Sequence, residues 1–456
     1  KVSFINLIYH SLIQKKNMKK LKWFVVVVLL GSFACDPNEP PTPLDPNQEV
    51  KKAIFDSMKE WYFWTEELPT NPDLSSYSSN EELLDGIIFK PLDRFSYLTT
   101  QEAFTNAFVG RNAGHGFGFA FTADEKLYIS FVFDESPAGI DGWQRGWEIT
   151  QINGQPISSY RTANGGYDFK LGPPDPGISN TFTFKLPDGT TTTRTNVKAE
   201  YQSNSVLDER VIDVDGKKVG YWAYQSFKAT AGLNPTRSSE VQSSMEFFQA
   251  EGIQELIIDL RYNGGGSVAV AEQIMNYLIQ PANNGKLMYV NKLNSIKTSL
   301  NDSENFSKIG NLNLNRIIFL TSRGSASASE LVINSLDPYM DLVLIGDNTF
   351  GKPVGSFPLS RYNNVLQRNN VELVPITFAT ANSEGKAEYF DGFPANFTVG
   401  DSPNVPWGDP ADARLNAAIQ YIRNGNVSGR LTRNYYRPKW EMIDAFKGLQ
   451  QEFPVF

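Results

Sequence analysis

The second half of the chain alternates strand-like and helix-like segments, and this alternation constrains the fold more than any other feature. Apolar strand runs and helical periodicities follow one another in the order 218–227, 238–250, 255–260, 268–278 and 316–321. Strands that alternate with helices in this way form a mostly parallel sheet covered by helices. We therefore predict an α/β core over residues 201–430.

A glycine-rich loop lies between the predicted strand 255–260 and the predicted helix 268–278. Its sequence, Arg-Tyr-Asn-Gly-Gly-Gly-Ser, lacks the Gly-Lys-Ser/Thr ending of a P-loop and the spacing of a dinucleotide fingerprint. Phosphate binding at the start of a helix is therefore the weaker of two interpretations. The other is an oxyanion hole, because glycines let backbone N–H groups approach a substrate carbonyl closely.

A serine-rich stretch, Gly-Ser-Ala-Ser-Ala-Ser-Glu, follows the predicted strand 316–321 and begins the next helix. The pair Ser327 and Glu330 has the spacing of a capping box, in which the hydroxyl accepts a hydrogen bond from an orphan backbone N–H. A helix start also collects free N–H groups and a positive dipole, which suits stabilisation of an oxyanion. The local sequence leaves Ser327 open as a cap or as a nucleophile.

Cysteine, histidine and charge exclude several functional classes. The chain has one cysteine, Cys35, and two histidines, His10 and His115. A Ser-His-Asp triad would have to use His115, and a zinc site would depend almost entirely on carboxylates. We therefore expect no metal and no cofactor. The net charge of −8, without a basic cluster beyond residue 22, argues against a nucleic-acid partner.

The N-terminus has the features of a targeting signal. A basic cluster at 18–22 precedes an apolar run, 23–34, that is shorter than the ~20 residues needed to span a membrane. Small residues then precede Cys35, and the pattern resembles a bacterial lipoprotein signal with cleavage and acylation at this cysteine. An ordinary secretory signal with an incidental cysteine is the alternative.

This interpretation sets the first boundaries. We expect residues 1–34 to comprise upstream sequence, up to a start at Met18, and the signal peptide. Residues 35–48 form a proline-rich tether. The protein would be lipid-anchored in the bacterial cell envelope, in the periplasm or on the outer membrane surface.

Two smaller domains are expected between the tether and the core. Helical spacing predicts an N-terminal helical domain at 49–108, and short strands with glycine turns predict a β-rich domain at 109–200. Within it, Ser-Pro-Ala-Gly at 136–139 and Gly-Trp-Glu-Ile-Thr-Gln-Ile-Asn-Gly at 146–154 resemble the PDZ signature. The residues that resemble the carboxylate-binding loop of that family are Gly116, Phe117, Gly118 and Phe119. Such a loop and its strand edge bind a peptide C-terminus; a structural hairpin without a ligand is the alternative.

Three motifs occur in the order and at the separations found in one family: 259–266 (Asp-Leu-Arg-x-Asn-x-Gly-Gly), 325–330 (Ser-Ala-Ser-Ala-Ser-Glu) and 350–352 (Phe-Gly-Lys). Over roughly residues 50–425 the chain resembles the S41 peptidases, the carboxyl-terminal-processing or tail-specific proteases. The resemblance implies a multidomain α/β protein with an N-terminal helical segment, a PDZ domain and a ClpP/crotonase-like serine protease core. The tail, 431–456, lies beyond it.

The resemblance also implies roles for individual residues. Ser327 would be the nucleophile and Lys352 the general base, with the amides of Gly265 or Gly266 and of Ala328 in the oxyanion hole. Many members carry a glutamine four residues beyond the lysine. Here that position is Ser356, which is a possible third member of the site, and Pro353 adjoins the base.

The expected function is a membrane-anchored serine endopeptidase that cleaves protein or peptide substrates near exposed C-termini captured by the PDZ-like domain. Its Ser-Lys dyad would act through an acyl-enzyme. The alternative is a catalytically silent peptide- or ligand-binding envelope lipoprotein on the same scaffold, which the altered surroundings of Lys352 favour. The sequence gives no oligomeric state.

Overall fold

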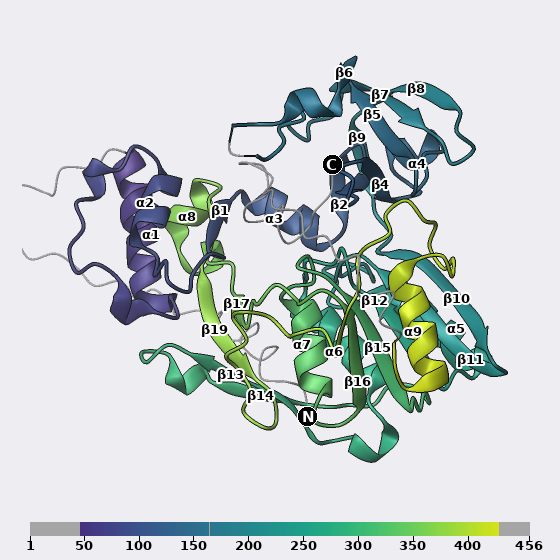
Figure 1. Ribbon diagram of the computed structural model, residues 1–456. Coiled ribbons are helices and arrows are strands. Elements are labelled where there is room, and N and C mark those ends of the chain that lie inside the picture. The colour runs from purple at the N-terminus through teal and green to yellow at the C-terminus, as the bar shows by residue number, and fades with distance from the viewer. Residues whose placement is uncertain (1–45, 164, 428–456) are drawn as a thin grey trace, which may run out of the picture. The chain divides into compact units, whose positions relative to one another are not determined.

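The computed structural model describes residues 46–163 and 165–427 (Figure 1). The predicted signal peptide, Cys35, nearly all of the tether and the tail 431–456 lie outside the described residues. None of the helices in the described part is both long enough and apolar enough to cross a membrane.

The core contains a six-stranded sheet in the order β10-β11-β12-β15-β16-β20. The strands are β10 (Val206–Val214), β11 (Lys217–Tyr224), β12 (Glu255–Asp259), β15 (Arg316–Thr321), β16 (Asp341–Gly346) and β20 (Phe397–Thr398). The five strands of this sheet from β11 to β20 run parallel to one another, and β10 is antiparallel at the edge. Parallel neighbours need crossover connections, which the helices between these strands supply. The predicted α/β core is confirmed.

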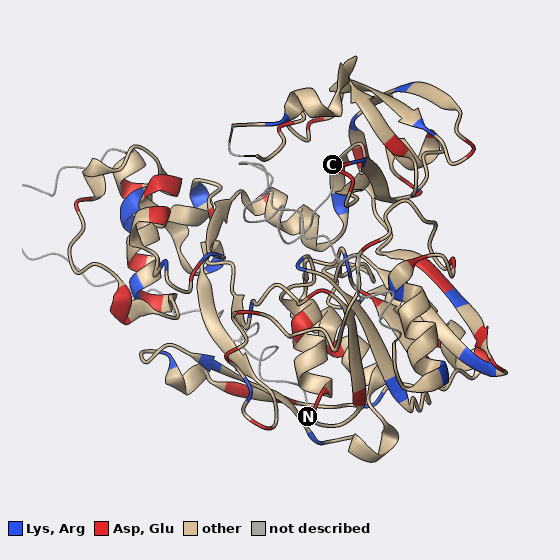
Figure 2. Ribbon diagram, viewed as in Figure 1, with Lys and Arg blue, Asp and Glu red and all other residues tan. Residues whose placement is uncertain are grey.

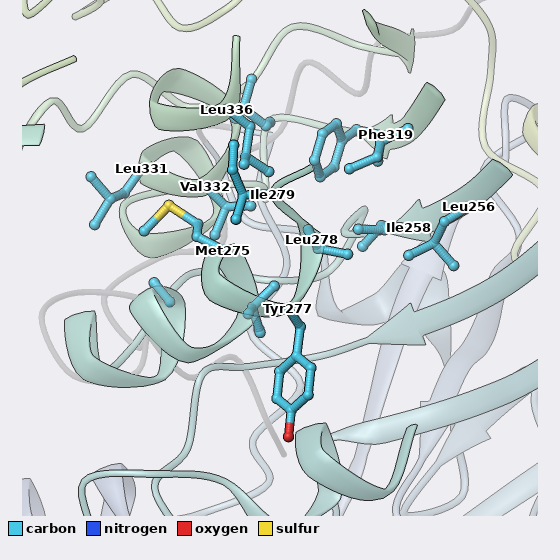
Figure 3. Close-up of a cluster of buried hydrophobic side chains, with 14 of the residues drawn as sticks. Leu256, Ile258, Met275, Tyr277, Leu278, Ile279, Phe319, Leu331, Val332 and Leu336 are labelled. Carbon is cyan, nitrogen blue, oxygen red and sulfur yellow. The ribbon is translucent and has the colours of Figure 1, made fainter. Parts of the chain in front are cut away.

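Helices cover both faces of this sheet. One face packs against α5 (Ser239–Glu251), α6 (Val268–Leu278) and α7 (Ala328–Leu336), and the other packs against α9 (Ala413–Asn424). Figure 3 shows Leu256 and Ile258 of β12 in one cluster with side chains of α6 and α7. Ile257, between them, faces the α9 side. Burial on both faces explains the unbroken apolar run of β12.

The parallel strands end at the same edge of the sheet, and the candidate motifs lie just beyond that edge. The glycine-rich loop follows β12, the serine-rich turn follows β15, and the turn with Lys352 follows β16. Residues far apart in the sequence are therefore brought together by strand order alone. Ligand and catalytic sites in parallel sheets commonly form at this edge.

The N-terminal helices share a hydrophobic core with a second sheet. Helices α1 (Pro46–Trp61) and α2 (Asn80–Ile87) pack against the sheet β14-β13-β19-β17. Its strands are β13 (Leu287–Leu293), β14 (Asp302–Asn305), β17 (Val354–Ser356) and β19 (Ile376–Ala381). Charged residues are frequent along α1 and α2 (Figure 2), at positions between the buried ones. The apolar stripes of the helices predicted burial but not this partner.

A segment that we call the β-rich module runs from Arg111 to Gln202. Its first strand, β2 (Arg111–Gly114), follows helix α3 (Gln101–Phe108). It pairs with the last strand of the module, β9 (Ala199–Gln202). The remaining strands form one sheet in the order β3-β4-β5-β7-β8, with β6 paired to β5. They are β3 (Phe117–Phe121), β4 (Leu127–Val132), β5 (Glu148–Ile152), β6 (Gln155–Pro156), β7 (Ser179–Lys185) and β8 (Thr191–Val197).

His115 lies in the core of the β-rich module. Its two ring nitrogens lie 2.7 Å from the Asn196 side chain and 2.9 Å from the Asn180 side chain, and the residue is fully buried. Burial lowers the pKa of His115, so the ring is neutral at pH 7 and holds a single N–H. Full burial and the contacts with Asn180 and Asn196 indicate a structural role for His115 in the module.

Arg145 connects the β-rich module to the protein core. Its guanidinium donates to the carbonyls of Val405 (2.7 Å) and Ser402 (2.9 Å) and lies 3.9 Å from the Trp407 ring. The Asp412 carboxylate is 3.6 Å away, and both charged side chains are buried. One buried cation therefore joins the module to the segment 401–412.

We predict that Arg145→Met lowers the free energy of unfolding by about 3 kcal/mol, because it leaves buried carbonyls without a donor and removes a charge that balances Asp412. Urea unfolding of the wild type and the variant measures this. Arg161→Met is the control, because its ion pair with Glu125 is about half exposed and is worth about 0–1 kcal/mol. Equal losses for both variants would contradict the assigned role of Arg145.

Candidate active site

Ser327 stands at a strained turn between β15 and α7. It caps α7 with φ of 56° and ψ of −113°, a conformation that L-residues rarely adopt. Such strain persists only where the surroundings enforce it, and it is concentrated at functional sites. A half-buried serine on a sharp strand-to-helix turn is the geometry of a nucleophile elbow. The Ser327 N–H donates to the Glu330 carboxylate (3.0 Å), as expected for the predicted capping box, and the role of Ser327 as nucleophile stays a prediction.

The neighbouring serines have structural partners. Both are fully buried. The Ser325 hydroxyl donates to the carbonyl of Leu260 (2.7 Å), and the Ser329 hydroxyl donates to the carbonyl of Asn263 (3.1 Å). These bonds fix the serine turn against the glycine-rich loop. Of the three serines, Ser327 alone is more than marginally exposed, which agrees with its selection as the candidate nucleophile.

The Glu330 carboxylate joins the Ser327 turn to the Lys352 turn. One oxygen accepts from the backbone N–H groups of Ser327 (3.0 Å) and Lys352 (2.8 Å). The other oxygen accepts from the Thr349 hydroxyl (2.6 Å) and the Gly351 N–H (2.7 Å). Two amides that lie 25 positions apart in the sequence therefore contact a single oxygen atom.

Two opposing effects act on the pKa of Glu330. Burial raises the pKa of Glu330 above its ordinary value, and the four donated hydrogen bonds oppose this effect. An ionised carboxylate is an acceptor only, which matches four donors that point at it. The sequence indicated only the capping role of Glu330, because the second turn was not visible from residue spacing.

Lys352 lies in a nearly closed, partly aromatic environment. The residue is 7% exposed, and its amine is 5.8 Å from the centre of the Phe95 ring. The turn before it is anchored to the serine turn, because the Phe350 N–H donates to the carbonyl of Ser325 (2.9 Å). Lys352 is therefore a buried side chain and not a solvated loop lysine.

Arg94 holds the Lys352 turn from the N-terminal side. Its guanidinium donates to the carbonyls of Phe350 (3.2 Å), Gly351 (3.3 Å) and Phe390 (3.0 Å). Sequence reasoning did not predict this contact. It equally missed Thr349, whose hydroxyl accepts from Phe393 N–H (2.7 Å) and donates to Glu330.

The glycine-rich loop lies directly against the Ser327 turn. A methyl group at Gly265 would lie 2.8 Å from Ser327 Cβ and 3.0 Å from the carbonyl oxygen of Ala326. The Gly265 N–H donates to the Asn263 side chain (2.9 Å). Of the two glycines predicted for the oxyanion hole, Gly266 therefore has the N–H that is not engaged in this turn.

A buried charge network fixes the start of this loop. Arg261 is 1% exposed and binds the carboxylates of Asp259, Asp401 and Asp412 at 2.7 Å each. Burial alone would raise the pKa of Asp412, but Arg261 and Arg145 lower it below the ordinary value. All three carboxylates are therefore partners of arginine. No cluster of potential metal ligands occurs within 46–163 and 165–427.

The remaining predicted site residues occupy two other places. Ser356 is half-buried on β17, where it pairs with Ile376 of β19, and its role as a third member stays a prediction. Gly116 directly precedes β3, and β3 contains Phe117, Gly118 and Phe119. This strand lies at one edge of the module sheet. Phe117 is fully buried and Phe119 packs on Phe169 (5.1 Å). What they can offer a peptide is therefore the backbone of β3.

Two family models match this chain. Residues 49–97 match the peptidase S41 N-terminal domain, and residues 218–370 match peptidase family S41. The resemblance of these two ranges to the S41 peptidases is therefore confirmed. Ser327 and Lys352 fall inside the second match. The whole β-rich module lies outside both.

Curated relatives agree with this assignment, and one solved structure has the same fold. A "Probable CtpA-like serine protease" of Staphylococcus saprophyticus is 25% identical over 68% of this chain and 58% of the relative. "Carboxyl-terminal-processing peptidase 3, chloroplastic" of Arabidopsis thaliana is 24% identical over 57% of this chain and 50% of the relative. The chain thus spans less than two thirds of the length of these relatives. The structure of a "Putative S41 protease" from Bacteroides fragilis has the same fold, with a TM-score of 0.65, 24% identity and coverage of 82% and 97% of the two chains.

We predict that Glu330→Gln lowers the free energy of unfolding by about 2–4 kcal/mol. A glutamine has one acceptor oxygen, so two of the four buried donors lose their partner in either orientation of the amide. Urea unfolding at pH 7 measures the loss.

Glu251→Gln is the matched control, because Glu251 pairs with Lys218 at the exposed end of α5. We expect this control to lose less than about 1 kcal/mol. A Glu330→Gln variant as stable as the control would mean that Glu330 is protonated in the wild type and joins the two turns less tightly than its four donors indicate.

Proposed function

We propose that the chain is a serine endopeptidase that cleaves protein substrates through Ser327 and Lys352. The observation that carries the proposal is the single Glu330 oxygen that accepts from the backbone N–H groups of both residues. It joins the strained serine turn to the buried lysine turn. The S41 domains and the relatives named as serine proteases support the same class of activity.

The proposed reaction begins when the Ser327 hydroxyl oxygen attacks the scissile carbonyl carbon and its proton passes to the Lys352 amine, which acts as the base. The N–H groups of Gly266 and Ala328 stabilise the oxyanion. The C–N bond then breaks, and Lys352 returns the proton to the leaving amine. Water attacks the resulting ester with Lys352 again as the base. The new carboxyl end leaves, and Ser327 regains its proton.

The β-rich module would capture the substrate near its C-terminus. Strand β3 is the edge of the module sheet and is paired on one side by β4. An edge strand can add an extended peptide through backbone hydrogen bonds, and the glycines before and within β3 would let N–H groups approach a terminal carboxylate. Docking of the module on the core by Arg145 is consistent with transfer of the captured chain to Ser327.

We predict that Ser327→Ala and Lys352→Met each lower the rate of casein cleavage by about a thousandfold or more, because each removes one half of a coupled dyad. The full chain is assayed by gel for new fragments. Lys217→Met is the control for loss of a lysine. It lies at the opposite end of β11 from the site and is about half exposed, so its rate should equal that of the wild type.

Wild-type cleavage no faster than that of Ser327→Ala would overturn the peptidase proposal. It would favour the silent peptide-binding scaffold, which the binding of uncleaved peptides would then demonstrate.

A second prediction concerns the chain end. A peptide substrate with a free C-terminal carboxylate should have a KM about tenfold lower than the same peptide with a C-terminal amide, because one charge-assisted contact is lost. The two peptides differ by one group, so steady-state kinetics on the wild type suffice. Equal KM values would show that the terminal carboxylate does not contribute to substrate recognition.

We further propose that Cys35 is acylated and holds the protein in the bacterial cell envelope. The sequence around Cys35 supports this site. Expression of the full chain in a bacterium fed a radiolabelled fatty acid should label the wild type and not Cys35→Ala. Label on both proteins would place the lipid elsewhere, and label on neither would leave an ordinary secretory signal.

A further inference from the structure

Lys228 is a completely buried lysine that the proposed reaction does not use. It follows β11 and is 0% exposed. Its amine donates to the Ser203 hydroxyl (2.7 Å) and lies 5.0 Å from the centre of the Phe133 ring. Burial of an amine is costly, and a methionine would fill similar space without that cost. The position therefore calls for a functional explanation.

The Ser203 hydroxyl marks the place where the chain enters and leaves the β-rich module. The module begins after Gly110 and ends before Ser203, and we call these two points the crossings of the module. The Ser203 hydroxyl donates to the carbonyl of Gly110 (3.2 Å) and accepts from the Asn112 side chain (2.9 Å), while the Ser203 N–H donates to the same carbonyl (2.8 Å). The Lys228 amine thus contacts the hydroxyl that ties both chain crossings together.

The backbone next to Lys228 holds the glycine-rich loop. The Phe227 N–H donates to the carbonyl of Gly265 (2.9 Å), and the Phe227 carbonyl accepts from the Ser267 N–H (2.8 Å). These two bonds bracket Gly266, which forms a parallel bridge with Phe227. A methyl group at Gly266 would lie 2.5 Å from the Phe227 carbonyl oxygen. The direction of the Gly266 N–H therefore depends on where Phe227 is held.

The residue on the other side of Lys228 is anchored as well. The Ala229 N–H donates to the carbonyl of Phe108 (2.9 Å), the last residue of α3. Three consecutive residues thus contact three different elements: the glycine-rich loop, the crossings of the β-rich module, and α3. Within this run, Lys228 makes its anchor with a side chain, so a substitution can remove that anchor without removing a backbone bond.

We propose that Lys228 is a positioning residue that ties the crossings of the β-rich module to the glycine-rich loop and so sets the direction of the Gly266 N–H. The inference rests on the proposed peptidase function, in which this N–H stabilises the oxyanion. Lys228 itself touches no reacting atom. Its effect reaches the site through the backbone of Phe227.

The test compares Lys228→Met with the wild type in the full chain. We expect kcat for peptide cleavage to fall about tenfold, the size of a weakened oxyanion contact, with KM changed less than about threefold. The midpoint of urea unfolding should stay equal or rise, because a buried amine is replaced by an apolar side chain of similar length. A fall in kcat together with a lower midpoint would assign Lys228 a structural role and overturn the proposal.

Lys308→Met is the matched control. Lys308 is a partly buried lysine of the core whose amine donates to the carbonyl of Tyr277, and burial lowers its pKa to about 8. It makes no contact with the glycine-rich loop among the hydrogen bonds of the described residues, so kcat should stay at the wild-type value. An equal fall in kcat for both variants would overturn the specific role of Lys228.

A double-mutant cycle with Ser203→Ala tests the contact itself. If both residues act through one hydrogen bond, the loss in kcat for the double variant should be smaller than the product of the two single losses. A loss equal to that product would show that the residues act independently and would overturn the link to the module crossings.

Hydrogen exchange provides a readout that does not depend on cleavage. The amides of residues 264–267 should exchange faster in Lys228→Met than in the wild type or in Lys308→Met. Unchanged exchange would overturn the proposal even if kcat fell. If the wild type cleaves no faster than Ser327→Ala, the peptidase function fails, while the exchange experiment still decides whether Lys228 positions the loop.

The pH dependence of stability tests the state of the amine. Burial lowers the pKa of Lys228 to about 7, and the charged group that acts against this is Glu240 at the start of α5. Because the folded form releases this proton at lower pH than the unfolded form, the Lys228 contribution should increase from pH 7 to 10 and be lost as the pH falls through 7. The stability difference between wild type and Lys228→Met should follow this trend. A difference that is constant with pH would contradict a buried amine at this position.

Discussion

The carboxylate of Glu330 is the interaction on which the candidate site depends. It accepts from the Ser327 turn on one side and from the Lys352 turn on the other, and it is fully buried. Buried donors without partners are costly, so the two turns are stable in this arrangement only together. The side chain that joins the strained Ser327 turn to the turn of the buried Lys352 takes no part in the proposed chemistry.

A second level of organisation comes from three arginines, of which Arg145 and Arg261 are buried. Arg261 fixes the start of the glycine-rich loop through three carboxylates, and Arg145 brings the β-rich module to the same segment, 401–412. Arg94 holds the Lys352 turn from the N-terminal domain. Each guanidinium joins segments that are distant in sequence, because its several donors can bond separate carbonyls and carboxylates at once. The site is thereby connected to every domain of the described chain.

The sequence predicted much of the core. The predicted strand 316–321 and helix 268–278 agree with β15 and α6 at both ends, because both carry strong apolar periodicity bounded by polar residues. The choice of Ser327 agrees with the burial of Ser325 and Ser329. The sequence did not predict that α1 and α2 share a core with β13, β17 and β19, because an apolar helix face indicates burial and not the identity of its partner.

What the sequence determined by itself is local: which segments form strands and helices, which turns follow them, and which residue types those turns contain. These depend on periodicity and on neighbours along the chain. The tertiary structure alone decided which turns meet. The Glu330 contact with Lys352, the engagement of the Gly265 N–H by Asn263 and the link from Lys228 to the module crossings all arise from strand order and close packing. Their partners are set by distances in space, which spacing along the sequence does not encode.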